Sequence, residues 1–211
     1  LIAVPLSESA SWRITMVIWA AFAFTALIPW LVEIRRGNNS GDPLGSVVGE
    51  KLAVTKSPTA WAIAISLCVS SATGYGMFAW LPDIAKDAAG MTELEGGLML
   101  SVFAFAGTPM SLAMPLIAAR IKNIGWLAAL GGALILTGFS AMLIAPTAAP
   151  FLWVVIFGSG PLLFPMALVL INLRTESPSA SLQLSSFAQF IAYSFAATVP
   201  PLMGLSRALT G

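Results

Sequence analysis

Five neutral side chains in two apolar stretches of the sequence are the groups best suited to binding chemistry. Ser71, Tyr75 and Phe78 follow one another at intervals of four and three residues, which places them on a common face of a helix. Gln189 and Tyr193 are spaced by four residues in a second stretch and share a stripe in the same way. Hydroxyl, amide and aromatic groups hold a polar solute by hydrogen bonds and stacking, so these are our candidate binding residues.

An amide and two glycines beside these residues each leave two explanations open. The amide of Gln189 is costly in an apolar environment unless it is paired, so we expect it to face either a solute cavity or a neighbouring helix. Gly74 and Gly76 flank Tyr75. They either weaken the helix enough to allow a gating bend or permit close packing of a neighbouring helix.

Prolines identify the candidate kinks of the chain. Pro161 removes one backbone donor, and the carbonyl four residues before it then needs another partner. Broken helices are tolerated where such groups line a cavity, so this segment is either a moving, unwound element or a static kink. Thr108–Pro109 is a weaker case of the same kind, and Pro200–Pro201 is expected to close its helix with a kink or a stop.

Several kinds of site are excluded within these 211 residues. There is no His, and the single Cys68 cannot form an internal disulfide or a thiolate cluster, so no metal site is expected. No acid pair lies inside an apolar stretch, and neither a nucleophile motif nor a phosphate-binding loop is present. We therefore expect no catalytic residues, no enzyme, no cofactor and no ATP-driven pump. The net charge of +1 without a basic cluster argues against nucleic-acid binding.

The elements that must position the candidate residues are membrane-spanning helices. Hydrophobic residues make up 58% of the chain and charged residues 9%, whereas soluble domains carry about 25% charged residues. A helix needs about 20 apolar residues to cross a bilayer. The charged residues separate the chain into runs of that length, and a turn at 145–150 divides the longest one. Six spans are predicted: 14–31, 57–81, 96–119, 126–145, 151–173 and 182–205.

The basic residues predict the orientation of these spans. When the loops are numbered alternately, seven Lys and Arg residues fall on one side and three on the other. Because cytoplasmic loops carry the excess of basic residues, loop 33–56 is predicted to be cytoplasmic and the acidic loop 83–95 external. Trp30, Trp80 and Trp126 lie near predicted span ends, where we interpret them as interfacial anchors.

Three blocks of sequence resemble one transporter family in combination. Residues 74–82 contain Gly-Tyr-Gly and end in Trp-Leu-Pro, residues 158–175 begin with Gly-Ser-Gly, and residues 185–204 end in Pro-Pro-Leu-Met-Gly. Together they resemble the major facilitator superfamily, and within it the cyanate permease and 2-nitroimidazole transporter family. The loop at 119–123 resembles only a degenerate form of the superfamily's basic, Gly-rich signature.

The resemblance implies an all-α polytopic membrane fold with six of about twelve transmembrane helices present. Residues 1–32 would then end an N-terminal helical bundle, 33–56 would be a cytoplasmic linker, and 57–211 would hold five helices of a C-terminal bundle that lacks its last helix. The first helix of each half lines the central cavity in this superfamily, which would make 57–81 a pore-lining span. The location implied is the bacterial plasma membrane.

The function implied is secondary transport of a small polar or anionic organic solute, cyanate-like or nitroheterocyclic, by alternating access. The partners would be this solute, the lipid bilayer and a coupling proton as a further candidate. Since no predicted span contains Asp, Glu, Lys or Arg, any charge that the mechanism needs would come from outside this chain. A non-transporting membrane scaffold and a membrane-embedded enzyme are the alternatives.

Overall fold

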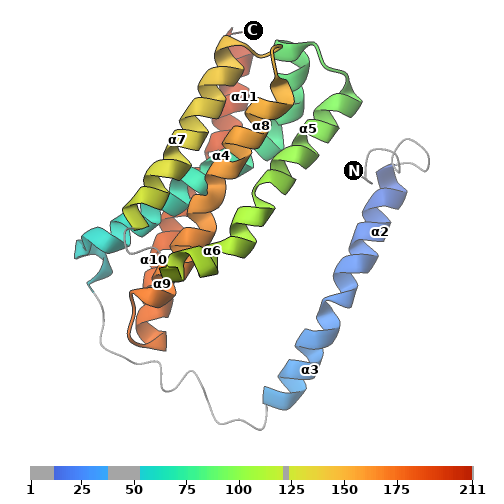
Figure 1. The fold of residues 1–211 in the computed structure, drawn as a ribbon. Coiled ribbons are helices and arrows are strands. Elements are labelled where there is room, and N and C mark those ends of the chain that lie inside the picture. The colour runs from blue at the N-terminus through green and yellow to red at the C-terminus, as the bar shows by residue number, and fades with distance from the viewer. Residues whose placement is uncertain (1–11, 38–52, 121–123, 211) are drawn as a thin grey trace. The chain divides into compact units, whose positions relative to one another are not determined.

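The computed structural model describes residues 12–37, 53–120 and 124–210, which form helices joined by short turns (Figure 1). These residues contain no strand, which agrees with the predicted all-α fold class. The chain divides into two compact units, residues 1–50 and 51–211, and the division falls inside the predicted linker 33–56.

The first unit contains α2 (Trp12–Thr25) and α3 (Leu27–Gly37). The two helices form one apolar stretch, Arg13–Arg35, that is long enough to cross a membrane and has a mean hydropathy of 2.0. At the junction, the Thr25 hydroxyl donates a hydrogen bond of 2.6 Å to the Phe22 carbonyl. Large apolar side chains such as Met16 and Trp30 are exposed, which suits contact with lipid.

The second unit begins with a 3-10 turn, η1 (Val54–Lys56), and the long helix α4 (Pro58–Ala89). The Ser57 side chain caps α4 by accepting from the Ala60 N–H at 3.3 Å. The predicted end at residue 81 was wrong, because α4 continues through Pro82 for two more turns. It stops at Gly90, whose φ of 66° lets its N–H reach back to the Ala85 and Lys86 carbonyls.

The next span is interrupted and the following one is continuous. α5 (Glu93–Ala106) starts with a capping box, in which the Thr92 hydroxyl accepts from the Glu95 N–H and the Glu95 carboxylate accepts from the Thr92 N–H. The helix is interrupted at Gly107, and α6 (Thr108–Arg120) follows, so the predicted span 96–119 consists of two helices. The break coincides with Thr108–Pro109, the predicted weaker kink. α7 (Ile124–Ile144) then runs without interruption.

The predicted span 151–173 contains the predicted proline break. α8 (Pro150–Ser159) passes into a 3-10 turn, η2 (Gly160–Leu162), and then into α9 (Leu163–Leu173). The Gly160 N–H donates to the Phe157 carbonyl, which is the carbonyl that Pro161 leaves without its helical donor. The 3-10 geometry therefore satisfies the backbone group that the proline frees.

The last predicted span, 182–205, is two helices, α10 (Pro178–Ala196) and α11 (Val199–Thr210). Pro200–Pro201 was expected to close its helix with a kink or a stop. α10 ends at Ala196, four residues before Pro200, and Pro200 lies in the first turn of α11, where a missing N–H costs nothing. Five stretches of the described residues are long and apolar enough to cross a membrane, and α10 is not among them. Its serines and glutamines lower its hydropathy. The five are Arg13–Arg35, Pro58–Ala89, Glu93–Met114, Ile124–Ile144 and Pro150–Leu173.

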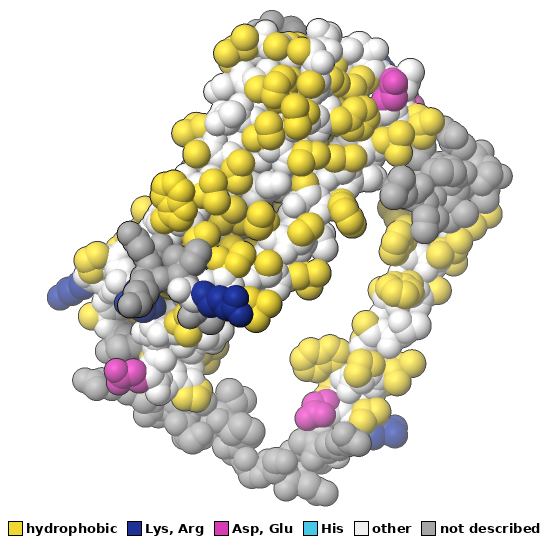
Figure 2. Space-filling model, in the orientation of Figure 1, with side chains coloured by type: hydrophobic (Ala, Val, Ile, Leu, Met, Phe, Trp, Pro, Cys, Tyr) yellow, Lys and Arg dark blue, Asp and Glu magenta, His cyan; other side chains and the backbone are white. Residues whose placement is uncertain are grey.

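Three buried apolar clusters hold the second unit together, and α4 takes part in two of them. One cluster joins α4 to α9 and α10. Another joins α4 to α5, α7 and α8. The third connects α6, α7, η2 and α9. Figure 2 shows that apolar side chains also cover much of the outer face, with charged side chains near the ends of the helices. That distribution is typical of a bundle surrounded by lipid.

Candidate functional site

Tyr75 on α4 and Tyr193 on α10 form the centre of the candidate site. Their ring centroids lie 6.4 Å apart with an interplanar angle of 48°. Tyr75 is 49% exposed and Tyr193 36% exposed, so both rings are accessible on this bundle. Among the described residues, neither phenol hydroxyl has a hydrogen-bond partner. The pair therefore offers two free hydroxyls and two ring faces to a ligand.

Small residues bring the two tyrosines together. Ala188 and Ala192 of α10 are completely or almost completely buried in the cluster that joins it to α4, as is Ala64 of α4. Side chains of this size allow the two helix backbones to approach closely. Tyr75 and Tyr193 are not part of this buried cluster, and their rings are partly exposed.

Ser71 and Phe78 share the predicted face of α4 but do not join the tyrosine pair. Ser71 is only 7% exposed, and its hydroxyl has no hydrogen-bond partner among the described residues. Phe78 is 51% exposed and packs edge-to-face against Phe103 of α5, with centroids 5.4 Å apart. On the predicted face of α4, Tyr75 therefore contacts α10, whereas Phe78 contacts α5.

The Phe78 ring begins a series of aromatic contacts that crosses the bundle. Phe103 also packs against Phe157 of α8 at 5.6 Å, and Phe157 stacks on Phe139 of α7 at 4.9 Å with an interplanar angle of 7°. Four helices are joined in this way. The orientation of Phe78 consequently depends on the position of α8, the helix that contains the proline break.

Gln189 finds its partner on its own helix. Its side-chain Nε2 donates to the Ser185 hydroxyl at 2.6 Å, so neither an interhelical bond nor a ligand is needed to satisfy that donor. The second hydrogen on Nε2 remains for another acceptor. Ser185 also lines an open, polar cavity of about 620 Å³ at the turn between α9 and α10. Asn172, Thr175 and Ser181 line the same cavity.

The two glycines beside Tyr75 differ in their surroundings. α4 is unbroken through both positions. A Cβ at Gly76 would meet Val199 and Met203 of α11 at 3.1 and 3.2 Å, so close packing accounts for this glycine. A Cβ at Gly74 would meet nothing within 4 Å, so Gly74 faces open space beside Tyr75. A bend at Gly74 remains a prediction.

Ser70 connects α4 to the proline break and was missed in the sequence analysis. It is 2% exposed, and its hydroxyl donates to the Pro161 carbonyl at 3.0 Å. Its position was a usable signal, because Ser70 lies three residues after Leu67 on the apolar face of α4 and a buried hydroxyl needs an acceptor. A 3-10 turn in a facing helix supplies carbonyls that can accept such a bond.

The surroundings of the tyrosine pair are neutral. Residues 57–82 and 177–206 contain no Asp, Glu, Lys or Arg. The described residues contain no group of three or more His, Cys, Asp or Glu side chains that could hold a metal ion. The arrangement can bind a solute by hydrogen bonding and stacking.

Comparisons with known proteins bear on the whole chain. The model of the Major Facilitator Superfamily matches residues 1–201. An uncharacterized transporter of Bacillus subtilis is 26% identical over 207 residues, covering 96% of this chain and 50% of the relative. The 2-nitroimidazole transporter of Escherichia coli is 27% identical over 203 residues, covering 95% and 51%. The cyanate transport protein of Escherichia coli is 26% identical over 207 residues, covering 98% and 53%.

The chain therefore spans about half the length of these curated relatives. No solved structure matches it. The matches confirm the predicted resemblance to this superfamily of transporters, and together with the long apolar helices they support a multi-pass integral membrane protein. The relatives are bacterial, which agrees with a location in the plasma membrane.

Proposed function

The chain belongs to the Major Facilitator Superfamily, and from this premise we propose that the intact protein is a secondary transporter of a small polar or anionic organic solute. The residues of this chain form one wall of the solute path. Tyr75, Gln189 and Tyr193 contact the solute, with Ser71 and Phe78 beside them. The remaining wall is contributed by helices outside the present sequence.

The observation that carries this proposal is the accessible Tyr75–Tyr193 pair on a neutral surface. An exposed aromatic pair with free hydroxyls is useful for binding, but it adds nothing to the packing of a scaffold. Membrane helices normally keep hydroxyl and amide groups against one another. Two phenols whose ring centroids lie 6.4 Å apart, and whose hydroxyls have no hydrogen-bond partner in the described part of the chain, are suited to a ligand that pairs with them.

The chemistry of this wall suits two kinds of solute. A flat nitroheterocycle can stack on a tyrosine ring, and a small anion such as cyanate can accept hydrogen bonds from the phenols and from the Gln189 amide. The names of two relatives, a 2-nitroimidazole transporter and a cyanate transport protein, support these classes. An anion would need a cationic partner, and proton coupling a titratable group, from other parts of the intact protein.

We propose that the solute moves by alternating access, with two helical bundles rocking about the site. The breaks at Gly107 and at Gly160–Leu162 are candidate points of local bending, since interrupted helical hydrogen bonding lowers the resistance to bending. Pro161 lies in the second of these breaks, and Pro200 follows the break between α10 and α11. Both prolines are proposed as kink points. Gly74 would allow adjustment of α4 next to Tyr75.

Transport by variants of the intact protein tests the proposal. Uptake of labelled cyanate and labelled 2-nitroimidazole would be measured in proteoliposomes for wild type, Tyr75→Phe and Gln189→Ala. Loss of one hydrogen bond to the solute should lower kcat/KM by about tenfold for the substrate that uses it. Tyr193→Phe, alone and with Tyr75→Phe, shows whether the two phenols act on the same solute, since coupled residues give non-additive losses.

Gln183→Ala is the matched control for Gln189→Ala. Gln183 lies on the same helix, and its amide donates to the hydroxyl four residues earlier, Ser179, at 3.3 Å, as Gln189 does to Ser185. The control should leave uptake unchanged. If Tyr75→Phe and Gln189→Ala also leave the kinetics of every transported solute unchanged, these residues do not form the site.

A further inference from the structure

α11 is a separate helix that lies against the end of α4 farther from η1. Ala197 and Thr198 interrupt the helix between α10 and α11. α11 then packs on α4 at Gly76, where an added Cβ would meet Val199 at 3.1 Å and Met203 at 3.2 Å. A helix with a break at its start can change its angle, so the contacts that hold it determine its position.

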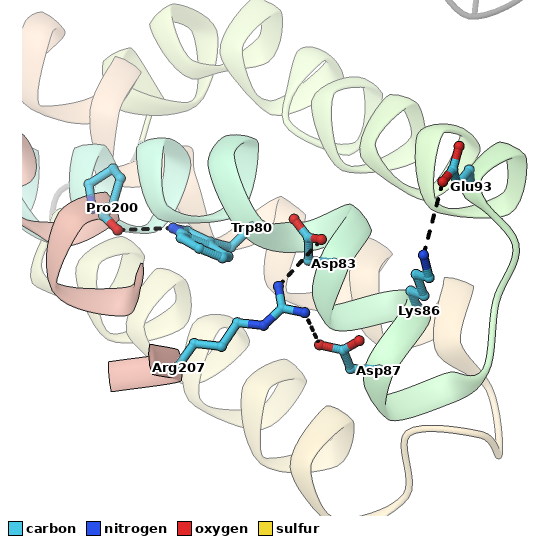
Figure 3. A network of polar contacts seen from close by, with 7 residues as sticks. All are labelled: Trp80, Asp83, Lys86, Asp87, Glu93, Pro200 and Arg207. Carbon is cyan, nitrogen blue, oxygen red and sulfur yellow. Dashed lines mark hydrogen bonds and ion pairs between the residues drawn. The ribbon is translucent and has the colours of Figure 1, made fainter. Parts of the chain in front are cut away.

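Trp80 of α4 holds the first two turns of α11 (Figure 3). Its indole Nε1 donates to the Pro200 carbonyl at 2.9 Å. The same ring covers Gly204, where an added Cβ would lie 2.8 Å from the indole Cζ2. The role of Trp80 therefore exceeds that of the interfacial anchor expected from the sequence.

Arg207 brings the third turn of α11 to the same indole. Its Nη2 lies 2.6 Å from Asp87 Oδ2, and its Nη1 lies 3.4 Å from Asp83 Oδ1. The guanidinium carbon is 5.7 Å from the centroid of the Trp80 ring. Asp83 and Asp87 are one turn apart on α4, so both carboxylates and the indole face one guanidinium group (Figure 3).

All three groups that surround the guanidinium belong to α4. A planar cation that donates to two carboxylates and lies near an indole has the partners that arginine side chains prefer. The site lines a cavity of about 380 Å³ together with Met203 and Ile84. The side chains of Arg207, Asp83 and Asp87 are 43%, 50% and 55% exposed, so dissolved ions can reach them.

We propose that Trp80, Asp83 and Asp87 form a guanidinium-binding site on α4, that Arg207 is its resident ligand, and that occupation of the site docks α11 onto this end of the bundle. A ligand that binds only the docked arrangement shifts the equilibrium toward it. Removal of the Arg207 side chain therefore releases α11. The vacated cavity is lined by Met203 and Ser206 of α11 as well as by the α4 groups, so a free guanidinium ion gains the α11 contacts only while α11 is docked and shifts the equilibrium back toward that arrangement. The proposal needs no transport activity and can fail independently of the proposed function.

Cysteine accessibility beneath α11 tests the proposal. The probe is Met203→Cys in a cysteine-free background of the intact protein in nanodiscs, where a water-soluble maleimide reaches both faces. Arg207→Gly should raise the labelling rate by about tenfold, which corresponds to the combined loss of two exposed ion pairs and one cation–π contact. Guanidinium chloride in the Arg207→Gly variant should return the rate toward that of the parent, and sodium chloride at the same concentration should not.

Two further variants make the result specific. Lys86→Gln is the matched control, because Lys86 lies on the same end of α4 and pairs with Glu93 at 4.0 Å, away from α11 (Figure 3). It should leave labelling unchanged. Asp87→Asn added to Arg207→Gly should abolish the rescue by guanidinium. Equal effects of the two salts, or an unchanged rate in Arg207→Gly, would overturn the proposal.

Discussion

A single methyl group at Gly138 should weaken the packing of α7 against α8. An alanine Cβ at this position would lie 2.6 Å from both the Cβ and the backbone nitrogen of Phe157 and 2.9 Å from its Cα. Ordinary contacts of a Cβ begin at 3.4 Å. Because two of the three atoms belong to the backbone, no side-chain rotation relieves the clash, and the helices must separate locally by about 0.8 Å.

Overpacking a close-packed interior lowers the free energy of unfolding by about 1–3 kcal/mol. A backbone contact belongs at the upper end, so we expect Gly138→Ala to lower the free energy of unfolding by about 2–3 kcal/mol. In a chain of this size, each kcal/mol changes Tm by about 2–4 °C, which predicts a fall of about 5–10 °C. The displacement would also move Phe157, and with it the aromatic contacts that end at Phe78.

Thermal unfolding in detergent, followed by size-exclusion chromatography of heated samples, measures this effect. Gly132→Ala is the matched control on the same helix, because a Cβ there meets nothing within 4 Å. Its Tm should stay the same or rise, since alanine favours a helix over glycine by up to about 1 kcal/mol. Equal Tm values for the two variants would refute the inference that α7 and α8 pack backbone against backbone at this point.

Two other hydrogen-bonded positions give predictions of the same kind. Ser70→Ala removes one of two donors to the half-buried Pro161 carbonyl, which keeps the Leu163 N–H, and should cost about 0.5–1.5 kcal/mol, measured as a lower Tm. Ser66→Ala should cost nothing measurable, because that exposed hydroxyl bonds only within its own helix, and an equal loss would contradict the role of Ser70. Thr92→Ala removes the capping box with Glu95 and should cost about 1 kcal/mol. Hydrogen exchange confined to the first turn of α5 would report it, and unchanged protection there would contradict it.

The helical architecture could be predicted because charged residues separate the apolar runs along the chain. The predicted boundaries were less accurate near two prolines. Pro82 lies inside α4, and Pro200 begins α11. A proline excludes one backbone hydrogen bond, but the tertiary contacts decide whether the helix continues past it. A Cβ added at Gly96 of α5 would lie 3.2 Å from the Cα of Pro82, so the absence of a side chain there lets α5 approach α4 at this proline, and no local pattern reveals it.

The helical face of each candidate residue could be predicted from spacing, but the contacts between the candidate residues could not. Spacing placed Tyr75 on one helical face and Tyr193 on another, and the structure brings the two rings together. Nothing in either stretch indicates which helices become neighbours. Phe78 was grouped with Tyr75 by the same spacing, yet it contacts α5 because α4 has different neighbours on adjoining parts of its surface. Gln189 found a nearby acceptor at Ser185, four residues away on its own helix.

The most direct test of the account is whether the tyrosine face meets water and solute. Cysteines would be introduced one at a time at positions 75 and 189 of the intact, cysteine-free protein, with Phe190→Cys as a control on the same helix that is exposed on the bundle. Labelling by a water-soluble maleimide would be measured with and without cyanate or 2-nitroimidazole. The account predicts that positions 75 and 189 are labelled and that a transported solute changes their labelling rates. The labelling rate at position 190 should be the same with and without solute. No labelling at 75 and 189, or labelling rates there that stay the same with every transported solute, would contradict it.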